Sequence, residues 1–154
     1  MRTMLLSFKA DVHKKVLSGE KIYEHRKVFP DEPIRAFLYV STPIKAITGI
    51  MHLRNKTSLE EWVKTYSYDK KAVQRINEYL KHYRYAMEIT DFQNTNMIPL
   101  EKLRQDIPGF VVPQMYYFID NSFIFEYLDK NLHAKGELIT HTFDGITSDM
   151  ICKK

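Results

Sequence analysis

The sequence predicts an α+β protein, mainly β, whose core is a small and mostly antiparallel barrel with helices at its ends. Strand-like segments come in runs: one strand, one short helix, three strands, two helices and two strands follow one another along the chain. Such an order excludes a doubly wound parallel sheet, in which strands and helices alternate. The middle of the chain changes from a two-residue to a 3.6-residue apolar period, which predicts an inserted helix pair. At 154 residues and 44% hydrophobic composition, the chain is long enough for one packed domain.

The predicted strands are short apolar or alternating runs bounded by turn residues. They cover residues 3–8, 22–29, 34–42, 46–53, 84–93 and 113–120. A short helix over residues 10–18 separates the first two strands, because Val12 and Val16 fall on one side and Gly19 stands where helices end. Gly49 interrupts an apolar strand and predicts a bend or bulge of the kind that curls small barrels.

Two helices are predicted in the middle of the chain by their caps and their apolar spacing. Ser58 followed by Glu61 forms a capping box, and Asp69 is a typical cap for the second helix. The apolar stripes are Leu59, Trp62, Val63 and Tyr66 in the first helix and Val73, Ile76, Leu80 and Tyr83 in the second. Because each stripe lies on one helix face, the two helices are expected to pack as a hairpin.

Residues 120–154 are expected to form a C-terminal extension packed on the domain made by residues 1–119. Two structures fit its pattern. Asp144 and Gly145 form a two-residue turn signal, which predicts a terminal hairpin between the flanking segments ELITHTF and ITSDMI. A helix over residues 122–133 also fits.

The chain carries a net charge of +4, and its basic residues gather near the N-terminus. Residues 1–30 hold seven lysines and arginines against three acids, whereas residues 120–154 hold four lysines against six acids. A positive N-terminal region suits a polyanionic partner such as RNA. The acidic C-terminal segment leaves open another role, that of a protein-interaction adaptor.

Several classes of protein are disfavoured by missing signals. The sequence has no apolar run of about 18 residues and no signal peptide, so we expect a cytoplasmic protein without a membrane partner. The lone Cys152 cannot form an internal disulfide. The histidines show no metal-ligand spacing, and no phosphate-binding loop, dinucleotide fingerprint or serine-hydrolase motif occurs. We therefore expect no metal and no cofactor.

A carboxylate and a guanidinium are predicted to point inward from the second strand. Alternation places Glu24 and Arg26 on one face between Ile22 and Val28, the side expected to face the core. Because an unpaired buried carboxylate is costly, the two groups either form a salt bridge that braces the sheet or line a wet hollow. Polar residues at the ends of nearby elements favour a concave site. They are Lys9, Lys21, Ser41 and Thr42.

The spacing of these residues resembles that of the ASCH domain, a small β-barrel related in fold to the PUA domain. The hallmark pattern of that family, G-x-K-x-x-E-x-R, is matched here by Gly19, Lys21, Glu24 and Arg26. One subgroup also has a lysine after the first strand, a "TSP"-like segment ending the third and a "PPQ" with aromatics in the last. The corresponding residues here are Lys9, STP at residues 41–43 and VPQMYYF at residues 112–118. The likeness covers residues 4–119 and implies a PUA-like barrel with a short first helix. The inserted helix pair rests on the apolar spacing described above, and the C-terminal extension, residues 120–154, lies outside the likeness.

The resemblance implies an RNA- or nucleotide-binding protein, regulatory in transcription or translation, that uses a basic cleft beside the first helix. The residues expected to line this cleft are Lys9, Lys21, Glu24, Arg26, Ser41 and Thr42, with Gln114 and Tyr116 on the far wall. The alternative is an enzyme with the same cleft, either a nucleoside amidohydrolase or a single-strand ribonuclease. Lys21 and Glu24 would then be the catalytic residues, although the amidohydrolases have threonine in place of Glu24. The ligand and the oligomeric state are left open.

Overall fold

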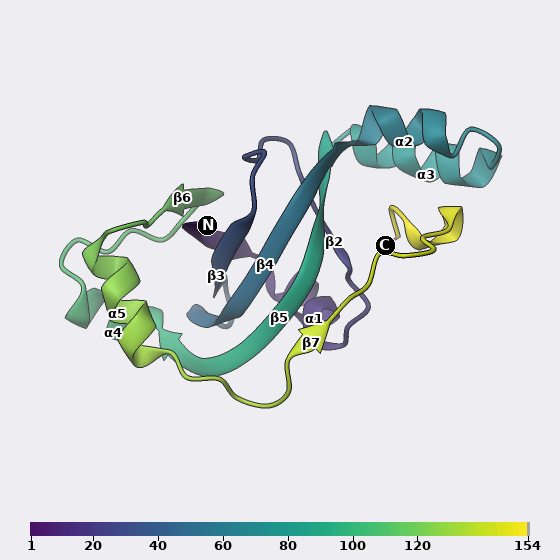
Figure 1. Cartoon of the computed structure of the whole chain (residues 1–154). Helices are drawn as coiled ribbons and strands as arrows, with labels where there is room; N and C mark the ends of the chain where they lie inside the picture. Colours follow the sequence, from purple (N-terminus) through teal and green to yellow (C-terminus); the bar gives the residue numbers. More distant parts are fainter. Residues whose placement is uncertain (154) are drawn as a thin grey trace.

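The structure is a computed structural model that describes residues 1–153, and these residues fold around one curled sheet (Figure 1). The strands are β1 (Arg2–Phe8), β2 (Tyr23–Arg26), β3 (Ile34–Val40), β4 (Ala46–Ser58), β5 (Tyr85–Pro99), β6 (Tyr116–Phe118) and β7 (Ile139–Thr140). The helices are α1 (Ala10–Leu17), α2 (Leu59–Thr65), α3 (Lys70–Leu80), α4 (Leu100–Asp106) and α5 (Phe123–Asn131), followed by a 3-10 turn, η1 (Ser148–Met150). This content confirms the predicted α+β class.

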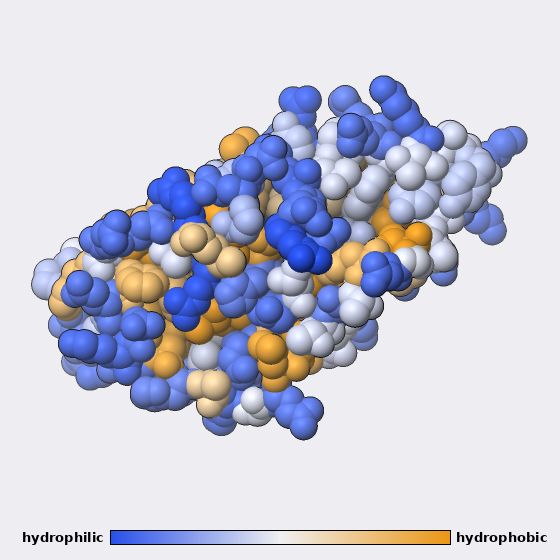
Figure 2. Space-filling view, viewed as in Figure 1, coloured by the Kyte–Doolittle hydropathy of each residue, from blue (hydrophilic) through white to orange (hydrophobic). Residues whose placement is uncertain are grey.

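The sheet is a half-barrel rather than a closed one. Its strands lie in the order β2-β5-β4-β3-β1-β6, and β7 pairs with β5. Strands β1 and β3 run parallel, while the other pairs are antiparallel. Helices α2 and α3 lie at one end of the sheet, and α4 and α5 lie at the other (Figure 1). Hydrophilic side chains cover most of the face seen in Figure 2, with smaller hydrophobic areas among them.

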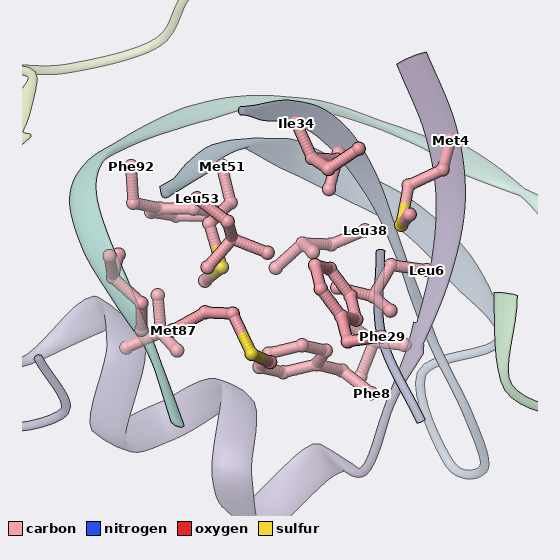
Figure 3. Close-up of a cluster of buried hydrophobic side chains, with 14 residues drawn as sticks. Met4, Leu6, Phe8, Phe29, Ile34, Leu38, Met51, Leu53, Met87 and Phe92 are labelled. Atoms are coloured by element: carbon pink, nitrogen blue, oxygen red, sulfur yellow. The ribbon is translucent and has the colours of Figure 1, made fainter. Parts of the chain in front are cut away.

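The main core fills the concave side of the sheet, with α1 packed over it. Side chains from β1, β3, β4 and β5, among them Leu6, Phe8, Leu38 and Met51, point toward one another there (Figure 3). Val16 of α1 belongs to the same cluster, as the apolar spacing of that helix predicts. A second cluster packs α4 and α5 against the other side of β1 and β3. Both strands are therefore buried on both faces, which explains their continuous apolar runs.

Strands β4 and β5 are longer than the predicted segments, which end at residues 53 and 93. Strand β4 continues to Ser58, whose side chain caps α2 by accepting a hydrogen bond from the Glu60 N–H. Asp69 caps α3 in the same way, as predicted. The predicted capping box is only half formed, because the Glu61 side chain does not bond back to Ser58 among the described residues. The added strand residues are mostly polar and partly exposed, so neither burial nor alternation marks them in the sequence. The long ribbon carries the α2/α3 hairpin away from the core (Figure 1).

The second strand differs from its prediction over residues 22–29. Strand β2 has only four residues, and Val28 is 57% exposed instead of facing the core. Both of its faces are covered, because Glu24 is 5% exposed and His25 is 9% exposed. Tyr23 and His25 face aromatic residues, among them Trp62 of α2 and Tyr79 of α3. The α2/α3 hairpin therefore covers the face that the alternation had placed away from the core.

After residue 120 the chain first forms α5 beside α4 and then crosses to the α2/α3 end of the sheet. Helix α5 confirms the helix expected over residues 122–133, and Ser122 caps it. The terminal hairpin was a wrong prediction, because β7 pairs with β5 and the segment after Gly145 forms η1. The turn signal is local, whereas β5 offers β7 a partner that is distant in the sequence. The last residues pack on α3: Ser148 Oγ donates to Asp69 Oδ2 at 2.6 Å, and Cys152 is buried.

Gly49 marks a bulge, as the sequence predicts. The pairing of β4 with β5 shifts register between Ile47 and Gly49. Space explains the glycine, since a Cβ atom there would lie 2.4 Å from Cζ of Phe92 and 2.7 Å from the Gln93 carbonyl oxygen. The sheet can therefore curl tightly over the Phe92 ring only because position 49 has no side chain.

Side chains bridge the gap between β2 and β1, which no backbone ladder joins. The Nη2 group of Arg26, at the end of β2, donates to the Ser7 carbonyl oxygen of β1 at 2.7 Å. The same guanidinium donates from Nε and Nη2 to Oε2 of Glu24, at 3.0 and 2.8 Å. Just beyond β2, the Phe29 ring packs against Tyr116 of β6, with centroids 5.6 Å apart. An ion pair and a ring contact thus replace a strand pairing at the open side of the half-barrel.

Glu24 stays ionised in this buried position because two cations and an N–H surround it. Its Oε1 atom lies 3.4 Å from Lys21 Nζ and accepts a hydrogen bond from the His25 N–H. Burial alone would raise the pKa of Glu24, but the charges of Lys21 and Arg26 and the Arg26 hydrogen bonds outweigh burial and lower it. The carboxylate is therefore a structural anion that fixes the Arg26 guanidinium.

The first prediction concerns the bulge. Gly49→Ala should lower the free energy of unfolding by about 1–3 kcal/mol, because the added methyl group overpacks the site. Urea denaturation followed by the fluorescence of Trp62, the one tryptophan of the chain, measures this loss. Phe92→Leu in the same chain makes room beside the methyl group, so the double variant should lose less than the sum of the two single losses. Strictly additive losses would contradict the steric explanation.

The second prediction concerns Glu24→Gln, which removes the anion and leaves two cations without a partner. The free energy of unfolding at pH 7 should fall by roughly 3–5 kcal/mol. A carboxyl group whose pKa is lowered by folding stabilises the protein above its ordinary pKa of 4.5, and this contribution is lost as the pH falls through the lowered value. The difference between parent and variant should therefore narrow in urea titrations below about pH 4.

Glu137→Gln is the matched control for this pH series, because Glu137 is exposed on a segment outside the helices and strands. It should leave the stability unchanged within about 0.5 kcal/mol. A Glu24→Gln deficit that is equally large at pH 3 and pH 7 would show that shape, and not charge, explains the loss.

Candidate functional site

The candidate site lies at the edge where β1 and β3 end together. Because the two strands are parallel and Phe8 is in register with Val40, Lys9 and Ser41 follow them at the same edge. The Ser41 N–H donates to the Phe8 carbonyl oxygen at 2.9 Å. Thr42 follows as an exposed residue. Three of the predicted site residues are thus brought together by the parallel pairing.

Helix α1 starts at this edge and holds Lys9 at its N-cap position. The Lys9 side chain does not cap the helix and is exposed, so its charge is free to meet a ligand. The helix is fixed to the sheet by a buried contact between His13 Nε2 and Thr48 Oγ1, 3.0 Å apart. Burial lowers the pKa of His13, so this contact is made by a neutral imidazole at pH 7.

Arg26 and the segment around β6 complete the edge. Arg26 reaches it through the Ser7 carbonyl oxygen, and the Ser7 N–H donates to the Met115 carbonyl oxygen at 2.9 Å. Tyr116 is in register with Leu6 of β1. Gln114 precedes Met115 and is exposed. Residues from both predicted walls therefore meet around the last two residues of β1.

The charges on β2 leave a net positive surface at this edge. Lys21, Glu24 and Arg26 together carry one excess positive charge, and the side chains of both cations are 17% exposed, against 6% for Glu24. The structure thus realises the salt bridge that the sequence left as one alternative, and it keeps the two cations at the surface. Glu24 accepts hydrogen bonds from within the protein. Neither of the two hollows described below is lined by Glu24 or by any other residue of the predicted cleft.

His25, on the opposite face of β2, belongs to the packing under α3. Its ring lies 4.8 Å from that of Tyr79, centroid to centroid, and its Nε2 atom has no hydrogen-bond partner among the described residues. Burial, followed by the charge of Lys21, lowers the pKa of His25 to about 3. The imidazole is therefore neutral at pH 7, which lets it pack among tyrosines.

A hollow of about 400 Å³ lies beside the end of β2 and was missed by the sequence analysis. We call it the basic hollow, and its lining residues are Lys27, Val28, Phe29, Lys56, Arg84 and Tyr85. They come from three segments far apart in the chain, so no spacing motif marks them. The only sequence signal is that Lys27 follows Arg26. A second hollow, of about 370 Å³, has mixed charge, with Arg54, Glu88 and Asp144 among its lining residues.

Residues 1–153 contain neither a cluster of metal-ligand side chains nor a membrane-spanning helix. No group of three or more histidine, cysteine, aspartate or glutamate side chains is placed so that it could hold a metal ion. Within the same residues, none of the helices has both the length and the apolar character needed to cross a bilayer.

Comparisons with known proteins identify the fold. No protein-family model matches the chain, and no curated protein sequence matches it. The crystal structure of ASCH from Zymomonas mobilis is similar, with a TM-score of 0.65 and 19% identity over 86% of this chain and 97% of that one. The crystal structure of a mutant of that Zymomonas mobilis protein gives a TM-score of 0.63 and 17% identity, over 86% of this chain and 100% of the other. The predicted resemblance is thus confirmed at the level of architecture, and the chain has the fold of an ASCH domain.

Proposed function

We propose that this chain is an RNA- or nucleotide-binding module of the ASCH type with a regulatory role, and that the edge formed by β1, β3 and β2 is its binding surface. The observation that carries the proposal is the convergence of Lys9 and Arg26 at the end of β1, beside a carboxylate that is already neutralised. A ligand at this edge meets positive charge and hydroxyl groups rather than Glu24. This combination suits a phosphate group.

Arg26 is the residue best placed to orient such a ligand. Its Nε and Nη2 groups are bound within the protein, whereas Nη1 donates no hydrogen bond to any described residue. The Nε/Nη2 fork of this guanidinium is therefore used within the protein, and the N–H groups of Nη1 are the donors that a phosphate or a base atom can meet. Little conformational freedom remains for a ligand to remove, so each contact costs less entropy.

The hydroxyl and aromatic groups at the edge support the same ligand class. Ser41 and Thr42 supply hydroxyl groups beside Lys9, and Tyr116 presents a half-buried ring on the β6 side. Aromatic rings next to cations are typical of proteins that bind single-stranded nucleic acid, because bases stack on rings while cations meet phosphates.

No geometric feature favours the enzymatic alternative over binding. A nucleophilic amine at position 21 has to be uncharged, whereas the Lys21 ammonium is ion-paired with Glu24. The pair instead accounts for both residues as parts of the charge cluster that holds Arg26. Catalysis is therefore an outcome that the following experiment can detect, not part of the proposal.

The third prediction tests binding at the edge. Lys9→Ala should weaken binding of single-stranded RNA by roughly three- to tenfold at low salt, and it should make the slope of log affinity against log salt shallower by about 0.7. Fluorescence anisotropy with a labelled oligonucleotide measures both. Lys9 contributes no side-chain cap to α1, so the fold should be unaffected. Lys130→Ala, an exposed residue of α5 that is not part of the proposed edge, is the matched control and should change neither value.

Two results would count against the proposal. Parent affinity that is equal at about 50 and 200 mM salt would exclude phosphate contacts as its source. Cleavage of the oligonucleotide that disappears in Lys21→Ala would replace the binding role with a catalytic one.

A further inference from the structure

We infer that the basic hollow is a second subsite for the same ligand, so that the chain binds a stretch of single-stranded RNA longer than one nucleotide. This inference rests on the proposed function and adds to it the length of the ligand and the path that it follows. The path leads from the edge at Lys9 and Arg26, along residues 26–29, into the basic hollow.

The charge of the basic hollow supports an anionic occupant. Three of its six lining residues are cationic and none is acidic. Lys27 and Arg84 are exposed, and their side chains make no hydrogen bond or ion pair with the described residues. The second hollow of the surface, which contains Glu88 and Asp144, lacks this property. Uncompensated cations around one concave surface are the feature that attracts a phosphate chain.

Lys56 is held in place without being neutralised. Its Nζ atom donates to the Phe29 carbonyl oxygen at 2.9 Å and lies 4.0 Å from the centroid of the Tyr85 ring. A carbonyl oxygen and an aromatic ring position an ammonium group but do not cancel its charge. The remaining donors of Lys56 can therefore meet a phosphate with little loss of side-chain freedom.

The basic hollow also offers apolar contact for a base. Val28 is 57% exposed, although it follows a buried strand, and it lines the hollow together with Phe29. Phe29 is only 3% exposed, so Val28 supplies the exposed apolar surface of the hollow. Bordered by lysine and arginine, this surface suits a nucleotide, whose base is flat and weakly hydrated and whose phosphate is charged. A simple inorganic anion would leave the Val28 surface unused.

The two subsites are continuous through the backbone that follows β2. Arg26 binds the β1 edge, and its own carbonyl oxygen accepts a hydrogen bond from the Arg84 N–H at 3.1 Å. Phe29 lines the basic hollow and also packs against Tyr116 at the edge. One strand of RNA can therefore contact both subsites without crossing an acidic surface among these residues.

The fourth prediction compares the affinities of a uridine mononucleotide and of an oligouridylate of about eight nucleotides. The parent should bind the oligonucleotide at least about tenfold more tightly, because two subsites act together. The double variant Lys27→Ala/Arg84→Ala should keep the mononucleotide affinity and lose most of this gain. Its salt slope for the oligonucleotide should be shallower by about 1.4, which is about 0.7 for each lost phosphate contact.

The control is the charge-matched double variant Arg104→Ala/Lys130→Ala, on α4 and α5. It removes the same number of positive charges from the other end of the sheet. The oligonucleotide should therefore keep its full gain in affinity over the mononucleotide. Thermal melts should show all variants folded, because the replaced side chains are exposed. If the control loses as much as the Lys27/Arg84 variant, net charge explains the gain and the inference is wrong.

The outcome for the parent separates this inference from the proposed function. Equal affinity of the parent for the mononucleotide and the oligonucleotide overturns the second subsite and leaves the proposed function standing. Failure of the parent to bind either probe overturns both.

Discussion

The guanidinium of Arg26 is the group on which both the closure and the chemistry of this half-barrel depend. It joins β2 to the backbone of β1, two strands that share no ladder, and it is held by a buried carboxylate. Backbone hydrogen bonds between two paired strands would satisfy all their polar groups. The side-chain contact between β2 and β1 instead leaves one nitrogen of Arg26 and the ammonium group of Lys21 near solvent. Breaking one member of such a buried pair is costly, so we expect the pair to stay closed when a ligand arrives.

The positive charge that remains at the surface after Glu24 is paired is the feature that the proposed function assigns to a ligand. The Glu24 carboxylate is paired inside the protein, and its single negative charge does not neutralise both Lys21 and Arg26. The same backbone then continues into the basic hollow, where Lys27 and Arg84 have no acidic neighbours among the lining residues. In the proposed function, stability and recognition are two uses of one short segment. This also explains why an inward-pointing acid belongs in a site whose expected ligand is an anion.

The parts of the structure that could be predicted from the sequence are those with a local physical signal. Apolar spacing marked the two helices, although Tyr83 of the second stripe lies beyond α3 and is 37% exposed. Asp69 marked a cap, and the glycine at position 49 marked the bulge. The polar ends of β4 and β5 had no such signal, because backbone pairing alone extends them. The turn at Asp144 and Gly145 was a local signal that a distant partner overrode. The basic hollow joins three segments, and only the fold brings them together.

The segment around residue 152 packs against the strand that carries the site. Ile151 and Cys152 share a buried cluster with Tyr23 of β2 and with Trp62 and Ile76 of the hairpin. Tyr23 is one residue away from Glu24. During synthesis, the face of β2 that carries Tyr23 is therefore covered in two steps, first by the α2/α3 hairpin and then by residues 151–152 once they have left the ribosome.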